Sequence, residues 1–526
     1  MMKFRKIVHT VIRLKPVQIR YQLRYRFRPL TRKMTGFRYP VSLPVEGNPL
    51  KLKPWISKPG SAEGNAFRFL NREMDMGTKI DWDEASFGKL WTYNLNYMDY
   101  LLQEKMDPSE RIRYIKDFIR DFPGNRTGKE PYPTSLRTIN WIKFMNRHRI
   151  RDREIDHSLY AQYRILLDNL EYHLMGNHLL ENGFSLLFGG LYFRDLKMYS
   201  RARHILSKEL CEQILSDGAH FELSPMYHQI ILDRMLDAVN LLQNNPVFDE
   251  LEILLMMISE KTSLMLGWLD EICFSDGSIP LFNDSTFGIA PSTSQLFDYA
   301  RRLKIPGYKV NPGRSGYRAF NQDTYEIRLD VGEIGPPYQP GHAHADTMNF
   351  EIYLRGKPLI VDTGISTYEK NGRRLYERST AAHNTVQLNG TDSSGVWGGF
   401  RVARRAGITR LLEGKDTVQA SHNGYRQYGN THQRSFRTGP DSILIMDRVH
   451  GRNHDSAVAR FHFHPSIQPE IENNRIRFQG GTLSFHGAKK ISLNEFRYAP
   501  EFNKLIPAIS AEILFSGELR SSITFN

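Results

Sequence analysis

The 526-residue sequence contains two cysteines, Cys211 and Cys273, which excludes a disulfide framework and any zinc site built on clustered cysteines. It has no apolar run of about 18 residues, so it predicts no membrane-spanning helix. It also lacks internal repeats and low-complexity segments. A metal site in this chain would therefore need histidine and carboxylate ligands.

Acidic residues are absent from the first 45 positions, where twelve of the fourteen net positive charges lie. Residues 1–50 are therefore predicted to form a basic arm. Its interspersed apolar residues predict a short amphipathic helix after Pro16. Such an arm could contact an anionic membrane surface, and the simpler interpretation is a solvated helix packed on the main body.

The residues of the arm also indicate whether it is a secretory signal and whether it binds nucleic acid. Arg13 and Lys15 interrupt the first apolar stretch, which makes a poor secretory signal. Interleaved Tyr and Arg are typical of stacking platforms for single strands. The rest of the chain does not repeat that chemistry, so we expect no nucleic-acid partner.

From about Phe87 to Cys273, apolar residues recur every three or four positions, which predicts a series of amphipathic helices. Several of these segments are apolar almost all round, as expected for helices buried between neighbours. A stack or ring of helical hairpins over residues 51–305 fits this pattern better than a four-helix bundle.

From about Tyr325 the apolar period changes to two, which predicts β-strands. Residues 355–358 and 479–482 are typical of hairpin turns. Many short strands with such turns predict an antiparallel sandwich over residues 317–526. Residues 306–316, rich in Pro and Gly, are the predicted linker, so the fold class is α+β with several domains.

The densest polar constellation is GHAHAD, which carries His342, His344 and Asp346, followed by Asp362 and then His383. In a strand, a spacing of two places His342 and His344 on one face. Two imidazoles and one carboxylate from adjacent strands can form a His₂Asp site of the zinc kind. Asp346 would then hold an imidazole tautomer. The alternative is a set of hydrogen-bonded polar residues at a strand end.

A second constellation lies in the helical half. Asn177 and His178 open a predicted helix, and Pro225 suits the first turn of another, which places Tyr227 near its start. Buried polar residues in apolar helices are costly unless they are satisfied. Together with the GHAHAD segment, these residues predict a cleft between the two domains.

A third cluster, YPTSLRTINW, contains Arg137, whose guanidinium could clamp a carboxylate through two parallel hydrogen bonds. Trp91 and Trp141 could offer faces for stacking sugars. We interpret both tryptophans as core residues.

The sequence resembles the heparinase II/III family of polysaccharide lyases. The resemblance runs in the family's order from about residue 85 to 390, through LWTYNLNYMDYL, YPTSLRTINW, NHLLENG, DGAHFELSPMYH, DGSIPLFNDS, GHAHAD, LIVDTG and RSTAAHNTV. It implies an N-terminal incomplete (α/α) toroid followed by a C-terminal antiparallel β-sandwich. It also implies cleavage of an acidic polysaccharide by β-elimination next to a uronic acid, as in a glycosaminoglycan or an alginate-like polymer.

The resemblance also implies residue roles. Asn177 would bind and neutralise the uronate carboxylate, with His178 beside it. Tyr227 would protonate the leaving oxygen and could also abstract the C5 proton. His342, reaching from the sandwich, would be the second candidate base. Arg137 resembles a substrate-side arginine.

Family members that bind a metal hold it on residues that match His344, Asp362 and His383. The resemblance thus implies a structural Zn²⁺ and no organic cofactor. It also implies a periplasmic location, which the poor secretory signal does not support. The basic arm resembles that of a subgroup found beside polysaccharide-assembly functions.

Two further functions stay open at this point. A non-catalytic glycan-binding or assembly protein could keep the same fold, because function resides in the site. A hydrolase would need two carboxyl groups about 5–9.5 Å apart. The candidate carboxyl groups are Glu181 with Glu222, and Asp276 with Asp284.

Overall fold

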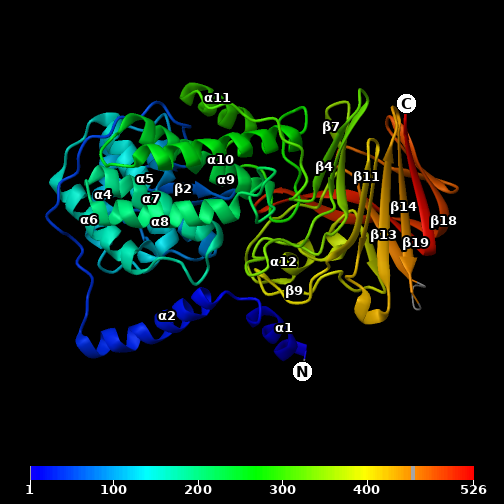
Figure 1. Cartoon of the computed structure of the whole chain (residues 1–526), viewed down its shortest axis with the longest axis horizontal. Coiled ribbons are helices and arrows are strands. Elements are labelled where there is room, and N and C mark those ends of the chain that lie inside the picture. Colours follow the sequence, from blue (N-terminus) through cyan, green and yellow to red (C-terminus); the bar gives the residue numbers. More distant parts are fainter. Residues whose placement is uncertain (1, 452–455) are drawn as a thin grey trace.

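A computed structural model describes residues 2–451 and 456–526 of the chain. It consists of a basic arm, a helical domain and a sheet-rich domain, in chain order (Figure 1). The predicted α+β class, with helices first and antiparallel strands second, is confirmed. No helix among the described residues is long and apolar enough to span a bilayer.

The helices of the second part pack as an incomplete toroid, with α5 against α7, α7 against α8, and α9 against α10. Trp91 and Trp141 lie in its core, as predicted. The helices are α3 (Lys89–Tyr97), α4 (Pro108–Asp121), α5 (Pro131–His148), α6 (Arg153–Asp168), α7 (Gly176–Tyr192), α8 (Leu196–Gln213), α9 (Pro225–Asn244), α10 (Leu251–Ile272) and α11 (Thr293–Leu303).

A small three-stranded sheet precedes these helices, and the periodicity did not predict it. Its strands have two to four residues, which is too short to produce a periodic signal. They are β1 (Ala62–Glu63), β2 (Ala66–Phe69) and β3 (Arg72–Asp75).

The sheet-rich domain packs a four-stranded antiparallel sheet against a larger antiparallel sheet, with one hydrophobic core between them. Ile327 and Phe350 reach this core from the first sheet, and Phe461 and Ile513 reach it from the second. Both predicted hairpin turns are confirmed, since they join β6 to β7 and β17 to β18.

The first sheet contains β4 (Tyr317–Asn321), β5 (Tyr325–Asp330), β6 (Asn349–Leu354) and β7 (Lys357–Ile360). The second contains β8 (Val386–Leu388), β11 (Ile408–Gly414), β12 (Thr417–His422), β13 (Thr431–Thr438), β14 (Ser442–His450), β15 (Ala457–His462), β16 (Glu470–Glu472), β17 (Arg475–Phe478), β18 (Gly481–Glu501) and β19 (Lys504–Phe525). Helix α12 (Gly372–Glu377) and the pair β9 (Val396–Trp397) and β10 (Arg401–Val402) lie in the connections.

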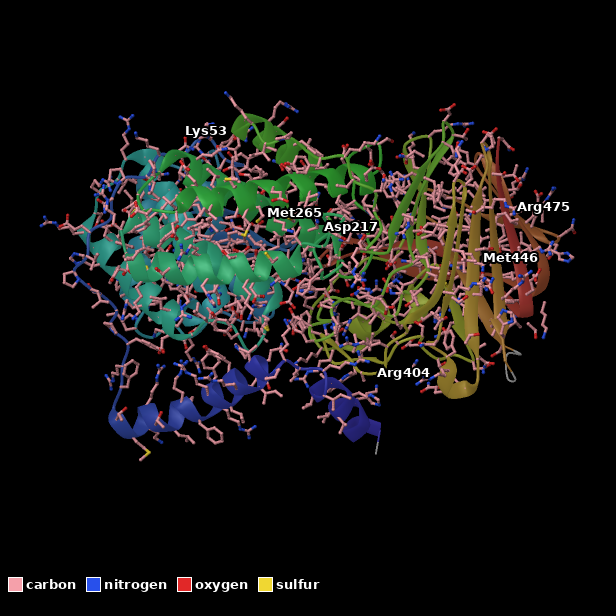
Figure 2. The ribbon with its side chains drawn as sticks, in the orientation of Figure 1. Lys53, Asp217, Met265, Arg404, Met446 and Arg475 are labelled. Atoms are coloured by element: carbon pink, nitrogen blue, oxygen red, sulfur yellow. The ribbon has the colours of Figure 1, made fainter. Side chains whose placement is uncertain are left out.

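The linker between the domains is tied to the helical side. Asp217 lies at the boundary between the two domains (Figure 2). Its Oδ2 accepts hydrogen bonds from the backbone N–H groups of Gly313 and Ser315, at 2.9 and 2.8 Å, and from the Ser315 hydroxyl at 2.7 Å. A buried carboxylate with three donors fixes the start of the sheet-rich domain against the toroid.

Candidate active site

The first turn of α7 carries Asn177. Its backbone N–H donates to Glu222 Oε1 at 2.9 Å, and its amide Nδ2 donates to Glu222 Oε2 at 2.8 Å. The approach is possible because the preceding residue, Gly176, has no side chain: a Cβ there would lie 2.3 Å from Glu222 Oε1. The φ of Gly176, +59°, also favours glycine. The Glu222 carboxylate thus holds Asn177 from two sides.

The first turn of α9 carries Tyr227, as predicted. Ser224 caps the helix by accepting from the Tyr227 backbone N–H, and Pro225 is the first helical residue. The Tyr227 ring stacks on His342 with centroids 3.8 Å apart, and its hydroxyl lies 3.4 Å from that of Tyr368. Burial raises the pKa of Tyr227 above its ordinary value, so the phenol keeps its proton.

Asp284 anchors the two histidines of GHAHAD. Its Oδ2 lies 2.9 Å from His342 Nδ1, and its Oδ1 lies 2.8 Å from His344 Nε2. Arg374 donates to both oxygens, at 2.5 and 2.7 Å. Burial would raise the pKa of Asp284, but Arg374 and the histidines outweigh it and hold the pKa well below its ordinary value. The carboxylate stays charged and fixes both imidazoles.

The other nitrogen of His342 faces the helical domain. His342 Nε2 lies 3.4 Å from Asn177 Nδ2 and 3.5 Å from Glu222 Oε2. The stacking on Tyr227 completes the cluster. The amide, phenol and imidazole that the sequence predicts to share a cleft are therefore brought together from two domains.

His178 lies beside this cluster and is partly exposed. Its Nδ1 lies 2.9 Å from Glu171 Oε1, and its ring centroid lies 4.4 Å from that of Tyr132. Burial opposes the charge on the ring, but Glu171 outweighs it and raises the pKa of His178 above its ordinary value. The imidazole is therefore readily protonated.

The segment around GHAHAD is irregular rather than a strand, so that local prediction was wrong. Its backbone bonds go to other segments: His344 N–H donates to Asn283 Oδ1 at 3.0 Å, and Ala345 N–H to the Arg378 carbonyl at 3.0 Å. Strand β6 begins after it, at Asn349. His342 and His344 point the same way because they share Asp284, not because of a pleat.

Arg137 is not brought to the cluster. It is fully buried in α5, where it donates to Gln162 Oε1 at 2.8 Å and to the carbonyls of Asn96 and Gly128 at 3.1 and 2.6 Å. Its guanidinium also lies 4.3 Å from the Phe118 ring centroid. Groups of the protein itself accept the hydrogen bonds of this guanidinium and cover its plane, so it cannot bind a substrate carboxylate.

The residues predicted to hold a metal are buried together in the sheet-rich domain. The rings of His344 and His383 lie 5.2 Å apart. His383 Nδ1 and the Asn349 amide occupy Asp362 Oδ2, at 2.7 and 2.6 Å. His344 Nδ1, His383 Nε2 and Asp346 Oδ2 are buried without a hydrogen-bond partner. Within the described parts of the chain, no group of three or more His, Cys, Asp or Glu is arranged to hold an ion.

The carboxylates considered for hydrolysis are engaged by other protein groups: Glu222 by Asn177, Asp284 by the two histidines, and Glu181 by Arg234. Burial nevertheless raises the pKa of Glu181 to about 7, against the effect of Arg234. The pKa of Asp284 is well below its ordinary value, and that of Glu222 is also lowered, because His342, His220 and Asn177 outweigh the effect of burial. Neither group can hold the proton that a general acid must donate. Asp276 instead accepts from Ser278 in an exposed turn.

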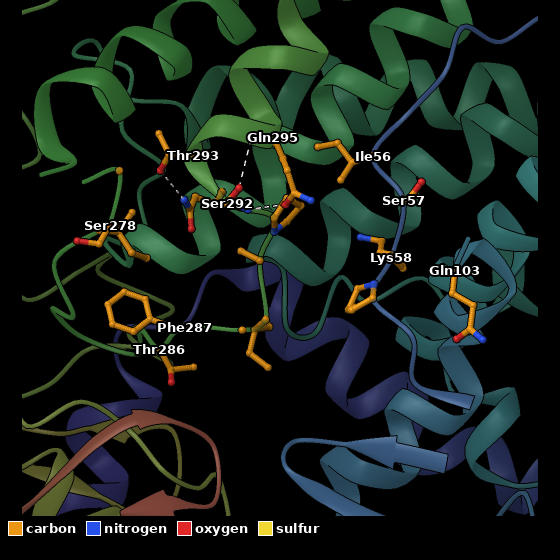
Figure 3. Close-up of a pocket in the computed structure, with 18 of the residues that line it drawn as sticks. Ile56, Ser57, Lys58, Gln103, Ser278, Thr286, Phe287, Ser292, Thr293 and Gln295 are labelled. Atoms are coloured by element: carbon orange, nitrogen blue, oxygen red, sulfur yellow. Dashed lines mark hydrogen bonds between the residues drawn. The ribbon is translucent and has the colours of Figure 1, made fainter. Parts of the chain in front are cut away.

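A cavity of about 760 Å³ is lined by Gln229 and Thr286, each two residues along the chain from a member of the cluster, but it does not contain the cluster. Figure 3 shows its wall, where Ser292 caps α11 by accepting from Gln295 and where Thr293 accepts from Gln229 of α9. None of the predicted catalytic residues is among the described residues that line it. We therefore locate the site by its converging polar groups and not by this cavity.

Sequence reasoning missed the anchoring roles of Asp284, Arg374 and Glu171. Asp284 was considered only for hydrolysis, and its DGSIPLFNDS segment has no periodicity that would indicate its direction. Arg374 lies in the short helix α12, far along the chain from its partner. One signal in the sequence could have indicated these partners. Charged residues lie close to apolar segments, and a charge that is buried there needs a partner.

Comparison with known protein families shows to which family the chain belongs. The family described as heparinase II/III N-terminus matches residues 63–302, and the family described as heparinase II/III-like, C-terminal, matches residues 310–526. The chain belongs to the heparinase II/III-like family. The junction of the two matches falls between α11 and β4.

Curated proteins with similar sequences are named heparin-sulfate lyases. A heparin-sulfate lyase of Bacteroides stercoris is 25% identical over 330 residues, which cover 58% of this chain and 48% of the relative. A heparin-sulfate lyase of Pedobacter heparinus is 27% identical over 358 residues, which cover 61% and 52%. The chain thus spans about half the length of the curated relatives it matches.

Solved structures share the heparinase II/III-like fold. A crystal structure of heparinase III matches with a TM-score of 0.64 and 17% identity, over 86% of this chain and 80% of that one. A heparan sulfate lyase mutant from Pedobacter heparinus matches with a TM-score of 0.56 and 18% identity, over 88% and 81%. These similarities support the architecture of a toroid followed by a sandwich.

Proposed function

We propose that this protein is a polysaccharide lyase that cleaves a uronic-acid-containing anionic polysaccharide by β-elimination. The observation that carries the proposal is the contact of Asn177, Tyr227 and His342 at the junction of the two domains. The names of the relatives, heparin-sulfate lyases, point to the same chemistry and to heparan sulfate as the first polymer to try.

In the proposed reaction a base removes the proton at C5 of the uronate. The C4–O4 bond then breaks, a C4–C5 double bond forms, and an acid protonates the departing O4. His342 is the base, since Asp284 engages Nδ1 and leaves Nε2 toward the helical domain. Tyr227 is the acid, since burial keeps its phenol protonated and Tyr368 orients the hydroxyl.

The negative charge that develops on the uronate carboxylate needs a partner. The Asn177 amide has two N–H donors: Glu222 accepts one, and the other faces His342 Nε2 at 3.4 Å, from which a bound uronate carboxylate would take it over. His178 is partly exposed, and its raised pKa favours the protonated ring, which would place a positive charge next to the Asn177 amide. Preorganised donors of this kind stabilise an enolate-like intermediate at little reorganisation cost.

A structural Zn²⁺ is proposed for the sheet-rich domain. The buried nitrogens His344 Nδ1 and His383 Nε2 lack partners and offer lone pairs, and Asp362 orients His383 through its other nitrogen. Asp346, whose Oδ2 also lacks a partner, is the carboxylate we favour as third ligand over Asp362, and these groups would have to draw together around the ion, because as described they are not arranged to hold one. Such an ion would brace the loops around GHAHAD, and no step of the elimination runs through it.

The direct test is an ultraviolet assay on a panel of polymers led by heparan sulfate, with heparin, chondroitin sulfate, hyaluronan and alginate. Elimination produces a C4–C5 double bond conjugated to the carboxylate, which absorbs in the ultraviolet. Mass analysis of the products should show the unsaturated end. Products with ordinary reducing ends and no new absorbance would identify a hydrolase and overturn the proposal.

The competing function is a glycan-binding protein without turnover. Wild-type protein that retains these polymers without cleaving them, and that still does so when Asn177, Tyr227 and His342 are all replaced by alanine, would favour that function. We expect the opposite, because a binding surface has no need of a buried Asp284–His342 pair beside a protonated phenol.

A further inference from the structure

Helix α2 (Pro16–Thr35) of the basic arm has two opposite faces. One face contacts the helical domain: Gln18 Nε2 donates to the Leu174 carbonyl at 3.2 Å, and the Tyr25 hydroxyl to the Leu170 carbonyl at 2.6 Å. Figure 1 shows α2 alongside the helical domain and α1 (Met2–Val11) continuing toward the sheet-rich domain, where it contacts β10. The arm is thus docked on the body through polar contacts.

The opposite face of α2 is an apolar stripe with no partner among the described residues. We define this outer stripe as Ile19, Leu23, Phe27, Leu30 and Met34, which are 39% to 87% exposed. At about 100° per residue, the outer stripe lies on the far side of the helix from the positions that contact the body. Exposed Val8, Val11 and Ile12 continue the apolar surface along and just beyond α1.

Basic residues border the outer stripe on both sides. On the same helical projection, Arg20 and Arg24 lie along one margin and Arg26 and Lys33 along the other. All four side chains are exposed. Only Arg24 among them has an acidic partner in the described structure, Asp168 at 3.7 Å. No acidic side chain of the first 45 residues offsets this charge.

We propose that the arm is an interfacial anchor that lays the outer stripe into the surface of an anionic lipid bilayer. A helix with an apolar face, basic margins and low overall hydrophobicity lies in the plane of the interface, with its apolar side chains among the acyl chains and its cations at the headgroups. The length and composition of α2 suit this position and not a transmembrane one.

The outer stripe and its basic margins together favour a lipid over an acidic polysaccharide as the partner of α2. A polysaccharide would use the basic margins but would leave Leu23, Phe27 and Leu30 in water, because its own surface is polar. An anionic bilayer can contact the apolar stripe with its acyl chains and the basic margins with its headgroups. Exposed apolar surface of this extent on a docked helix is typical of an interaction site.

The test uses the full chain in co-sedimentation with vesicles of phosphatidylcholine alone and of phosphatidylcholine with phosphatidylglycerol. Wild type should bind the anionic vesicles, bind the neutral ones far less, and dissociate as salt is raised. The stripe variant Leu23→Ser/Phe27→Ser/Leu30→Ser should lower the bound fraction about tenfold, because hydrophobic insertion is lost. The margin variant Arg20→Gln/Arg26→Gln/Lys33→Gln should lower it on anionic vesicles alone.

A matched control lies on α10, where Ile253 and Met256 are also exposed, at 69% and 72%. Ile253→Ser/Met256→Ser should bind vesicles like wild type. Thermal unfolding should be unchanged in all variants, because none of the substituted side chains is buried.

Three outcomes would overturn the proposal. Wild type could ignore anionic vesicles, or the stripe variant could bind them as wild type does. Light scattering could also show a wild-type oligomer that the stripe variant dissociates, without vesicle binding by either, which would make the stripe a protein–protein interface. The test does not depend on lyase activity, so its failure leaves the proposed function untouched.

Discussion

The rings of Tyr227 and His342 stack with centroids 3.8 Å apart and planes inclined by 27°, although one residue lies on a toroid helix and the other in a loop of the sheet-rich domain. A candidate acid and a candidate base this close can serve neighbouring atoms of one sugar ring. The contact also makes the site a product of domain packing, since neither domain contains both groups.

Replacing Tyr227 by phenylalanine removes the proposed acid and keeps the stacked ring. We expect turnover to fall about 100-fold or more, in line with the usual contribution of a general acid, with unchanged thermal unfolding. The measurement compares the initial rate at which ultraviolet absorbance rises with the variant and with wild type. Tyr308→Phe, at a tyrosine that is 45% exposed, is the matched control and should be fully active. Full activity of Tyr227→Phe would remove the acid role.

Arg137 should matter for stability and not for substrate binding. Arg137→Ala leaves the carbonyls of Asn96 and Gly128 and the Gln162 side chain without their buried donor. Each unsatisfied buried group costs about 1–3 kcal/mol, so we expect the free energy of unfolding to fall by about 3 kcal/mol or more. Denaturant titration measures this loss. KM of the folded fraction should not change, and a large rise in KM with normal stability would instead support substrate contact.

Asp447 should make stability depend on pH in the acid range. It is buried on β14 and accepts from Arg434 and His432, at 2.7 Å each; these interactions outweigh burial and lower its pKa from 3.8 to about 2. A depressed carboxyl pKa contributes stability that is fully present above the unfolded-state value and is lost as pH falls through the folded-state value. We expect a loss of about 2 kcal/mol between pH 4 and pH 2.

The control for this prediction is Asp447→Asn. It should be less stable at neutral pH by about 3–5 kcal/mol, because Arg434 keeps a buried charge without its partner. It should also lose the extra slope of unfolding free energy against pH in the acid range. An identical slope in variant and wild type would assign the acid sensitivity to other carboxylates.

Purified protein should contain close to one zinc per chain by elemental analysis, if the buried histidine nitrogens bind the proposed ion. Chelation should then lower the unfolding temperature, because binding to the folded state adds to its stability. His383→Ala should abolish the metal content. His464→Ala, in the same domain but outside this cluster, should leave the zinc stoichiometry unchanged. Zinc-free protein with an unaltered response to chelator would contradict the proposal.

The parts of the fold that could be predicted from the sequence are those with a regular period. The predicted Asn177 and His178 lie in the first turn of helix α7, and helix α9 begins at Pro225, because first-turn residues act locally. Strand alternation and turn residues predicted the hairpin of β6 and β7 for the same reason.

Prediction failed where partners are distant in the chain or where the backbone is irregular. Asp284, His342 and Arg374 form one buried unit from three separate segments, and no local pattern encodes that meeting. The strand predicted around His342 failed because side chains and loops take its backbone bonds. Arg137 was assigned to substrate because its charge was visible in the sequence and its buried acceptors were not.

The segment of residues 168–174 lies between the arm and the candidate cluster. On one side it offers Asp168, Leu170 and Leu174 to helix α2, and on the other it carries Glu171, the partner of His178. The arm and the imidazole beside Asn177 thus share contacts with one stretch of seven residues. Removing α2 would therefore take hydrogen bonds away from the same segment that positions the partner of His178.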